Sequence, residues 1–182
     1  MMLITDSACS RWVLMWWWEQ KIVPDVDRLQ WTWVPLESVG PLRFGASCDD
    51  VIEALGSAAS TGWDQEHRWA DFDDLGIRTY YERHEDGGLM AVIADVLYGP
   101  QVHYDGTTFT GRPPSELNLW IEKVADTEPV HTSVYGEPSF PSLGLVLRST
   151  ANGDRTFSRP VFTSRAWIQC AHPEELLPPP WA

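Results

Sequence analysis

Cysteine is scarce in this sequence, and its placement excludes two common ways of stabilising a small protein. The three cysteines are Cys9, Cys48 and Cys170, and none of them forms a CxxC pair. An odd number without that spacing argues against a disulfide framework or a zinc site and favours a reducing cytoplasm. The sequence also lacks GxGxxG, Walker, HExxH and GxSxG motifs, so it predicts no cofactor, no metal ligand and no catalytic residue.

Positive charge is scarce as well. The chain has 13 Lys and Arg against 26 Asp and Glu, which gives a net charge of −13. Phosphate binding requires a basic surface, so we do not expect nucleic acid or an anionic membrane as a partner. An acidic surface instead speeds the approach of a basic protein. The alternative is that the acidic residues serve solubility alone.

Long hydrophobic runs are missing too. The N-terminal run Trp12–Trp18 has seven apolar residues, whereas a transmembrane helix needs about 20. No basic cluster precedes it and no small-residue cleavage site follows, so a signal peptide is not expected. We interpret residues 1–35 as an N-terminal extension, with contact at a membrane interface as the alternative. Residues 173–182 contain "LPPP", which favours an extended polyproline tail.

A pattern that occurs twice is the main positive feature of the sequence. In the first copy "LRFGA" precedes the helix-like "SCDDVIEALG" and the strand-like "LGIRTYYE". In the second copy "TFTGR" precedes "PPSELNLWIEKVAD" and "LGLVLRS". Ser47 and Gly56 are typical residues for the start and end of a helix. Gly45 corresponds to Gly111, and the hairpin turn "EDGG" corresponds to "ANGD".

This pattern predicts an α+β fold. We expect two tandem β-α-β-β-β units, residues 39–104 and 107–170, within a domain that spans residues 36–172. They would form one antiparallel sheet with two helices packed on one face. A unit of about 65 residues buries too little surface alone, so two units joined edge to edge are the economical arrangement. The alternative is a chance similarity between two hairpins.

The same residues carry a resemblance to a known family. The stretches "GPLRFGASCDDVIEALG", "LGIRTYYERHEDGGLMAVI" and "PSLGLVLR" resemble uncharacterised, mostly actinobacterial small proteins with tandem helix-plus-β-meander repeats. Some of these look like immunity proteins encoded beside toxins. The plan is also similar to the fold of β-lactamase inhibitor protein and of small outer-membrane assembly lipoproteins. The resemblance covers residues 36–170 and implies this fold and a protein partner. Its motifs are structural, no lipobox precedes the domain, and no functional residue is carried over.

Candidate partner-binding residues concentrate in "WDQEHRWADFDD", which we interpret as part of a loop after the first helix. Aromatic residues surrounded by acidic ones are typical of a protein-binding hot spot. Alternation along the strands adds residues on an open face of the sheet. The candidates are Trp63, Asp64, Glu66, His67, Trp69, Asp71, Phe72 and Asp73 in the loop, and Tyr80, Glu82 and Arg148 on the strands. A solvated loop is the alternative.

The sequence therefore favours a non-enzymatic protein-binding module, in the manner of an immunity protein or inhibitor that neutralises a basic toxin. A second hypothesis is a small-molecule-binding protein or a small acid–base enzyme. Its site would lie between the sheet and loop 57–74, with Asp71, Asp73, His67 or His103 as acid–base groups. A third hypothesis is a structural or envelope-associated module that contacts a membrane through residues 11–18.

Overall fold

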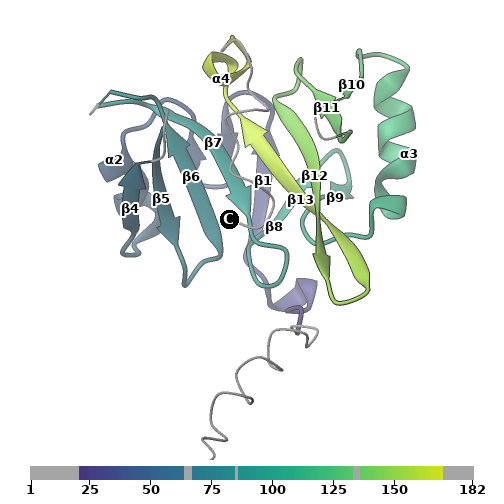
Figure 1. Cartoon of the computed structure of the whole chain (residues 1–182), viewed down its shortest axis with the longest axis horizontal. Helices are drawn as coiled ribbons and strands as arrows, with labels where there is room; N and C mark the ends of the chain where they lie inside the picture. Colours follow the sequence, from purple (N-terminus) through teal and green to yellow (C-terminus); the bar gives the residue numbers. More distant parts are fainter. Residues whose placement is uncertain (1–20, 64–66, 85, 133–135, 170–182) are drawn as a thin grey trace, which may run out of the picture.

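Two β-sheets enclose the core of the protein. The computed structural model describes residues 21–63, 67–84, 86–132 and 136–169. Figure 1 shows the larger sheet towards the viewer, with α3 at one side and β1 of the smaller sheet behind it. The elements in chain order are η2 (Asp25–Asp27), β1 (Gln30–Val34), β2 (Ser38–Val39), β3 (Leu42–Arg43), α2 (Cys48–Leu55), β4 (Ser60–Trp63), β5 (Arg68–Phe72), β6 (Ile77–Tyr81), β7 (Leu89–Ala94), β8 (Gln101–Tyr104), β9 (Thr107–Thr108), α3 (Pro114–Ala125), β10 (His131–Thr132), β11 (Pro138–Phe140), β12 (Leu145–Asn152), β13 (Arg155–Thr163) and α4 (Arg165–Gln169).

The larger sheet has eight strands in the order β10-β11-β12-β13-β7-β6-β5-β4. Its neighbouring strands pair in the antiparallel sense. β7 and β13 lie at the centre, where Val161 pairs with Ile93 and Phe162 pairs with Val92. Every residue of β7 is buried, as its continuous apolar sequence predicts for a strand covered on both faces. The expected α+β class with mainly antiparallel strands is confirmed.

A second, smaller sheet corrects the expectation of a single sheet. Its strand order is β3-β2-β1-β8-β9, and β1 runs parallel to β8. β1 falls within residues 1–35, which the sequence analysis treated as an extension. Its sequence QWTWV alternates between exposed and buried positions, and Trp31 and Trp33 are the buried ones. The parallel partner of β1 lies far along the chain, with Trp31 opposite Val102, so local sequence patterns did not reveal this pairing.

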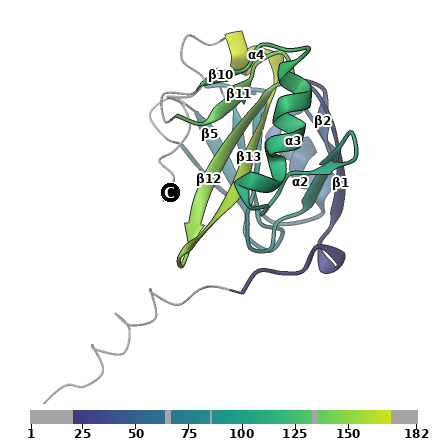
Figure 2. The same ribbon diagram turned by 90° about the vertical axis from the view of Figure 1, so that its right-hand side faces the viewer.

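The main core lies between the two sheets. Trp33 of the smaller sheet contacts Phe162 of the larger one, with ring centroids 5.1 Å apart. Helix α2 contributes Val51 to this core, and helix α3 contributes Leu117 and Trp120. In Figure 2, α3 lies in front, with β12 and β13 on one side of it and β1 and β2 on the other. Both helices therefore pack on the same face of the larger sheet.

The helix termini follow from local sequence. The Ser47 hydroxyl accepts a hydrogen bond from the amide of Asp50, and the Asp50 carboxylate accepts one from the amide of Ser47, which forms a capping box. These hydrogen bonds to Ser47 lower the pKa of Asp50. Gly56 ends α2 with φ of 60°, a left-handed conformation that glycine adopts without strain. Helix α3 has Pro114 at its first position, where no amide hydrogen is needed.

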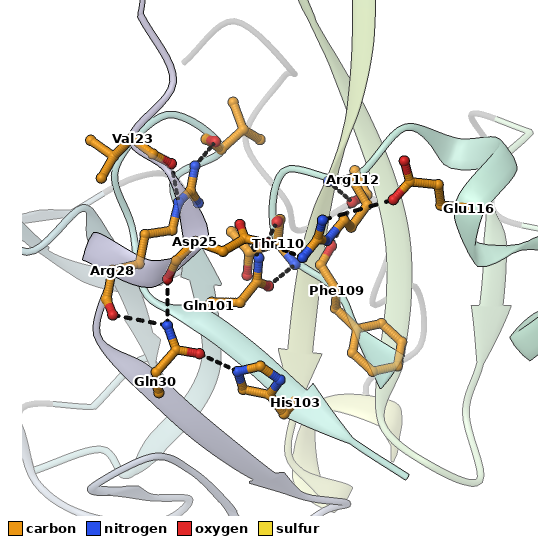
Figure 3. Close-up of polar contacts among 12 residues, drawn as sticks. Val23, Asp25, Arg28, Gln30, Gln101, His103, Phe109, Thr110, Arg112 and Glu116 are labelled. Atoms are coloured by element: carbon orange, nitrogen blue, oxygen red, sulfur yellow. Dashed lines mark hydrogen bonds and ion pairs between the residues drawn. The ribbon is translucent and has the colours of Figure 1, made fainter. Parts of the chain in front are cut away.

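A buried arginine fixes the segment that leads into β1. The Arg28 guanidinium donates hydrogen bonds to the backbone carbonyls of Val23, Val96, Leu97 and Gly99, at 2.9, 2.7, 3.0 and 3.3 Å. Figure 3 shows the bond to Val23. Its side chain is buried, and desolvation lowers the pKa of Arg28. These bonds join the entry to β1 to the turn before β8, so they help to set the two strands side by side.

A network of polar side chains extends from this anchor across the smaller sheet (Figure 3). The Asp25 carboxylate accepts a hydrogen bond from the Gln101 amide at 2.9 Å and forms an ion pair with Arg112. The side chain of Gln30 donates to the Asp25 carbonyl and lies 2.5 Å from a ring nitrogen of His103. Because these groups satisfy one another and the backbone, we interpret this network as structural.

We expect Arg28→Met to lower the free energy of unfolding by about 3 kcal/mol, because several buried carbonyls would lose their donor. Urea denaturation followed by tryptophan fluorescence measures this change. Arg43→Met is the matched control, since Arg43 is exposed on β3 and its replacement should change the free energy by no more than about 0.5 kcal/mol. Equal effects of the two substitutions would show that the carbonyl contacts of Arg28 contribute nothing.

Candidate functional site

The larger sheet has a second face, here called the outer face, which is turned away from the smaller sheet. Strand alternation places Trp69 and Asp71 of β5 on this face, because Ala70 between them packs in the core. The same argument places Arg78 and Tyr80 of β6 on it, and their partners in the register are Asp71 and Trp69. Unlike the apolar inner face, the outer face mixes aromatic, aliphatic and charged side chains.

One end of the outer face is covered by α4, a helix that the sequence analysis did not predict. Trp167 of α4 packs in a buried cluster with Tyr80, Ala91 and Val161. Its ring lies 5.2 Å from that of His67 and 6.3 Å from that of Tyr80. This end of the face is therefore closed by the chain itself, and His67 is buried beneath it.

The opposite end of the outer face is charged, and no described helix covers it. In Figure 1, α4 lies at one end of the larger sheet and the turns that follow β5 and β7 lie at the other. A pocket of about 120 Å³ lies beside these turns, and we call it the arginine pocket. Its polar lining residues are Asp71, Asp73, Arg78, Asp95, Tyr98 and Arg159.

Two of these residues form a closed ion pair. Arg78 donates from two nitrogens to the two carboxylate oxygens of Asp71, with both distances 2.5 Å. Such a bidentate pair is stronger than a neutral hydrogen bond and holds both groups in one orientation. Hydrogen bonding to Asp71 raises the pKa of Arg78, against the opposing effect of burial. The Arg78 guanidinium also lies 5.4 Å from the centre of the Trp69 ring, a cation–π contact.

The turn after β7 places an acid and an aromatic residue at the mouth of the pocket. The Asp95 carboxylate accepts hydrogen bonds from the backbone amides of Leu97 and Tyr98, at 2.7 and 3.3 Å. Tyr98 is 44% exposed. Burial of its hydroxyl, followed by the charges of Asp95, Asp73 and Asp71, raises the pKa of Tyr98.

Arg159 is the cationic residue of the pocket that has the fewest polar contacts among the described residues. Among the described residues it has neither a hydrogen-bond partner nor an ion pair, and its Nε is buried. Its partner in the register with β12 is another arginine, Arg148, which lies 3.3 Å from a carboxylate oxygen of Glu137. Desolvation lowers the pKa of Arg159, because burial disfavours the charged form.

The structure brings together some of the sequence-predicted residues and separates others. The outer face includes His67, Trp69, Asp71, Tyr80 and Arg148, and Asp73 lies at the turn beside this face. Asp64 and Glu66 lie outside the described residues. Much of the stretch interpreted as a loop forms strands β4 and β5.

The structure contradicts one predicted partner-binding residue, and two others lie apart from the arginine pocket. Phe72 is fully buried in the main core, so it cannot contact a partner. Trp63 is exposed, but it pairs with Arg68 and so lies on the opposite side of the sheet from Trp69. Glu82 is paired with His84, with an O–N distance of 2.8 Å, on the hairpin that follows β6.

Several residues of the site were not identified from the sequence: Arg78, Asp95, Tyr98, Arg159 and Trp167. A signal existed for Arg78, which has the same strand parity as the candidate Tyr80. Arg159 lies two residues before Val161 on β13 and therefore faces the same side of the sheet. Only the pairing of β13 with β7 brings Arg159 beside Asp71 and Arg78. No local pattern predicts a pairing of this range.

Of the residues of the alternative acid–base hypothesis, Asp71 and Asp73 both line the arginine pocket, whereas His67 and His103 are absent from its lining. Asp71 is engaged by Arg78, His67 is packed against Trp167, and His103 lies on the smaller sheet beside Gln30. Within the described ranges, no group of three or more His, Cys, Asp or Glu side chains is placed to hold a metal ion. None of the helices described is long and apolar enough to cross a membrane.

Comparison with known proteins identifies no relative. No protein-family model matches the chain, and no curated protein or solved structure matches it significantly. The resemblance to the immunity-protein-like family therefore stays a prediction, and the function has to be argued from the outer face itself.

We expect Asp71→Asn to lower the free energy of unfolding by about 2 kcal/mol, because half-buried Arg78 would lose its charged, bidentate acceptor. Chemical denaturation at neutral pH measures this value. Asp73→Asn removes the same charge from an exposed neighbour and should stay within about 0.5 kcal/mol of the wild type. A loss of the same size in both variants would mean that total charge, and not the ion pair, is responsible.

Proposed function

We propose that this protein is a recognition module that binds another protein through the open end of its outer face. The observation that carries this proposal is the composition of that end. The arginine pocket is lined by Arg78, Arg159 and Tyr98, and Trp69 makes a cation–π contact with Arg78. Arg, Tyr and Trp are the residue types most enriched in the energetic centres of protein interfaces.

The size of the pocket favours a protein partner over a small molecule. Its volume is about 120 Å³, whereas pockets for small-molecule ligands are typically about 300–1,000 Å³. A cavity of this size accepts one side chain, and the surface around it provides the remaining contacts. We therefore keep the small-molecule hypothesis only as an outcome of the tests below.

We further propose that the larger sheet is assembled from the two tandem units expected from the sequence. In the larger sheet, β4–β7 are neighbours in chain order, and so are β10–β13. The two sets meet where β7 pairs with β13. The corresponding glycines of the two copies also share a conformation. Gly45 and Gly111 have φ of 85° and 67°, and Gly76 and Gly144 have φ of 63° and 71°. Two units joined in this way offer a broad, continuous surface.

The manner of binding that we favour is that of an immunity protein or inhibitor. The net charge of −13 would attract a partner that is basic as a whole and would increase the rate of association. The buried free thiol of Cys48 is compatible with a reducing compartment such as the cytoplasm.

A site-specific photocrosslinker tests this proposal. p-Benzoylphenylalanine at position 98, in the open end of the outer face, should capture a discrete protein in cells of the source organism. The same group at position 119, on the exposed side of α3, should not capture it. Leu119 is a suitable control because it is also apolar and is 80% exposed.

The captured protein must then bind in purified form. We expect Tyr98→Ala to weaken the affinity at least tenfold, about 1.4 kcal/mol, as loss of an interfacial tyrosine does. Leu119→Ala should leave the affinity unchanged, and isothermal titration calorimetry measures both. Equal affinities of wild type and Tyr98→Ala would place the interface elsewhere on the molecule.

A further inference from the structure

We propose that Arg159 is a carboxylate-binding site, which receives the side chain of an aspartate or glutamate presented by the partner protein. This inference rests on the proposed function, since it names the chemistry that the open end of the outer face recognises. It is independent of which protein the partner is.

Arg159 has no ion-paired counter-ion among the described residues. Around the arginine pocket, Asp71 is occupied by Arg78 in a bidentate pair. The carboxylate of Asp95 accepts two backbone amide hydrogens from its own turn. On the other side of Arg159, Arg148 has Glu137 as its ion-pair partner. Arg159 alone, among the charged groups that line the pocket in the described chain, is a mostly buried cation without a hydrogen-bonded or paired group.

The electrostatic environment of Arg159 disfavours its charged form. Burial lowers its pKa, and the positive charges of Arg78 and Arg148 act in the same direction. Asp95 and Tyr80 oppose them, but neither is in hydrogen-bond contact with the guanidinium. A charge that is desolvated and flanked by like charges destabilises the free protein, and an incoming anion relieves that cost.

The geometry of the guanidinium and the charges of the pocket favour one kind of anion. A guanidinium presents a planar fork that matches the two oxygens of a carboxylate. Asp73 and Asp95 also line the pocket, and their negative charges disfavour a dianion such as phosphate. A carboxylate carries a single negative charge and fits a cavity of about 120 Å³ together with one or two methylene groups. An acidic side chain of the partner satisfies both requirements.

Arg159 can be tested without the partner, by NMR of the arginine Nε–Hε groups in the full chain labelled with ¹⁵N. The probes are sodium acetate, acetyl-Gly-Glu-Gly-amide and the neutral acetyl-Gly-Gln-Gly-amide, at constant chloride concentration. We expect the Arg159 signal to shift saturably with the first two probes and at least tenfold less with the third. The signal of Arg155, an exposed arginine of the same strand, should not move. The absence of a saturable shift at Arg159, or an equal shift at Arg155, would overturn the proposal.

The same titration distinguishes a partner side chain from a free metabolite. Comparable affinities for acetate and for the glutamate peptide support a protein carboxylate. Binding of acetate that is more than tenfold tighter than that of the peptide would assign the site to a free carboxylic acid and would overturn the assignment to a partner.

A stability measurement tests the cost of the uncompensated charge. Arg159→Met keeps the methylene packing and removes the cation, so we expect the Tm to rise by about 2–4 °C. Arg155→Met is the matched control and should leave the Tm unchanged. A fall in Tm for Arg159→Met would contradict the claim that the charge is uncompensated.

If Arg159→Met does not fold, Arg159→Lys replaces it. This variant keeps the charge and loses the fork, so it should keep the wild-type Tm and lose the response to the glutamate peptide. Full retention of that response would overturn the proposal. A negative result in these experiments would overturn the carboxylate site at Arg159 but not the proposal that the outer face binds a protein. Conversely, failure to capture a partner would count against the proposed function, whereas the titrations would still show whether Arg159 binds a carboxylate.

Discussion

The pairing of β7 with β13 is the contact on which the rest of the structure depends. Without it, β4–β7 and β10–β13 would be two separate meanders, each with an unpaired edge. Sets of this size bury too little surface to be stable alone. The pairing also sets the register between the two halves, with Val161 opposite Ile93. It thereby determines which charged side chains from one half meet those of the other.

The two faces of the larger sheet differ in how the described chain covers them. The inner face is closed by α2, α3 and the smaller sheet, and aromatic contacts such as Trp33 with Phe162 hold it in place. Within the described part of the chain, α4 covers one end of the outer face. At the other end, Arg159 has no hydrogen-bonded or ion-paired partner among the described residues. The stability of the inner face can offset the destabilisation that such a charge causes, and binding surfaces often contain destabilising groups.

The parts of the fold that could be predicted from sequence are those specified by neighbouring residues. The capping box at Ser47 and the left-handed Gly56 mark α2 in the sequence itself. Strand alternation grouped Tyr80 with Arg148, and the strand pairings place both on the outer face, where both are buried. These features require only the geometry of one helix or one strand.

The parts that could not be predicted depend on pairing between distant segments. The two tryptophans of β1 were assigned to an extension because their partner strand β8 is parallel and remote. The sequence grouped Phe72 and Trp63 with Trp69 because side chains in a loop do not alternate between two faces. In the strands, Phe72 and Trp63 lie on the other side of the sheet from Trp69. Arg159 gained its significance only from the residues across the sheet.

Native-state hydrogen exchange tests the central claim, that the larger sheet is one continuous unit joined at β7 and β13. The account predicts that the hydrogen-bonded amides of these two strands exchange most slowly, with free energies equal to that of global unfolding. They should exchange together with the protected amides of β6 and β12. Exchange of the β7 and β13 amides at a clearly lower free energy, while each meander stays protected, would contradict the account.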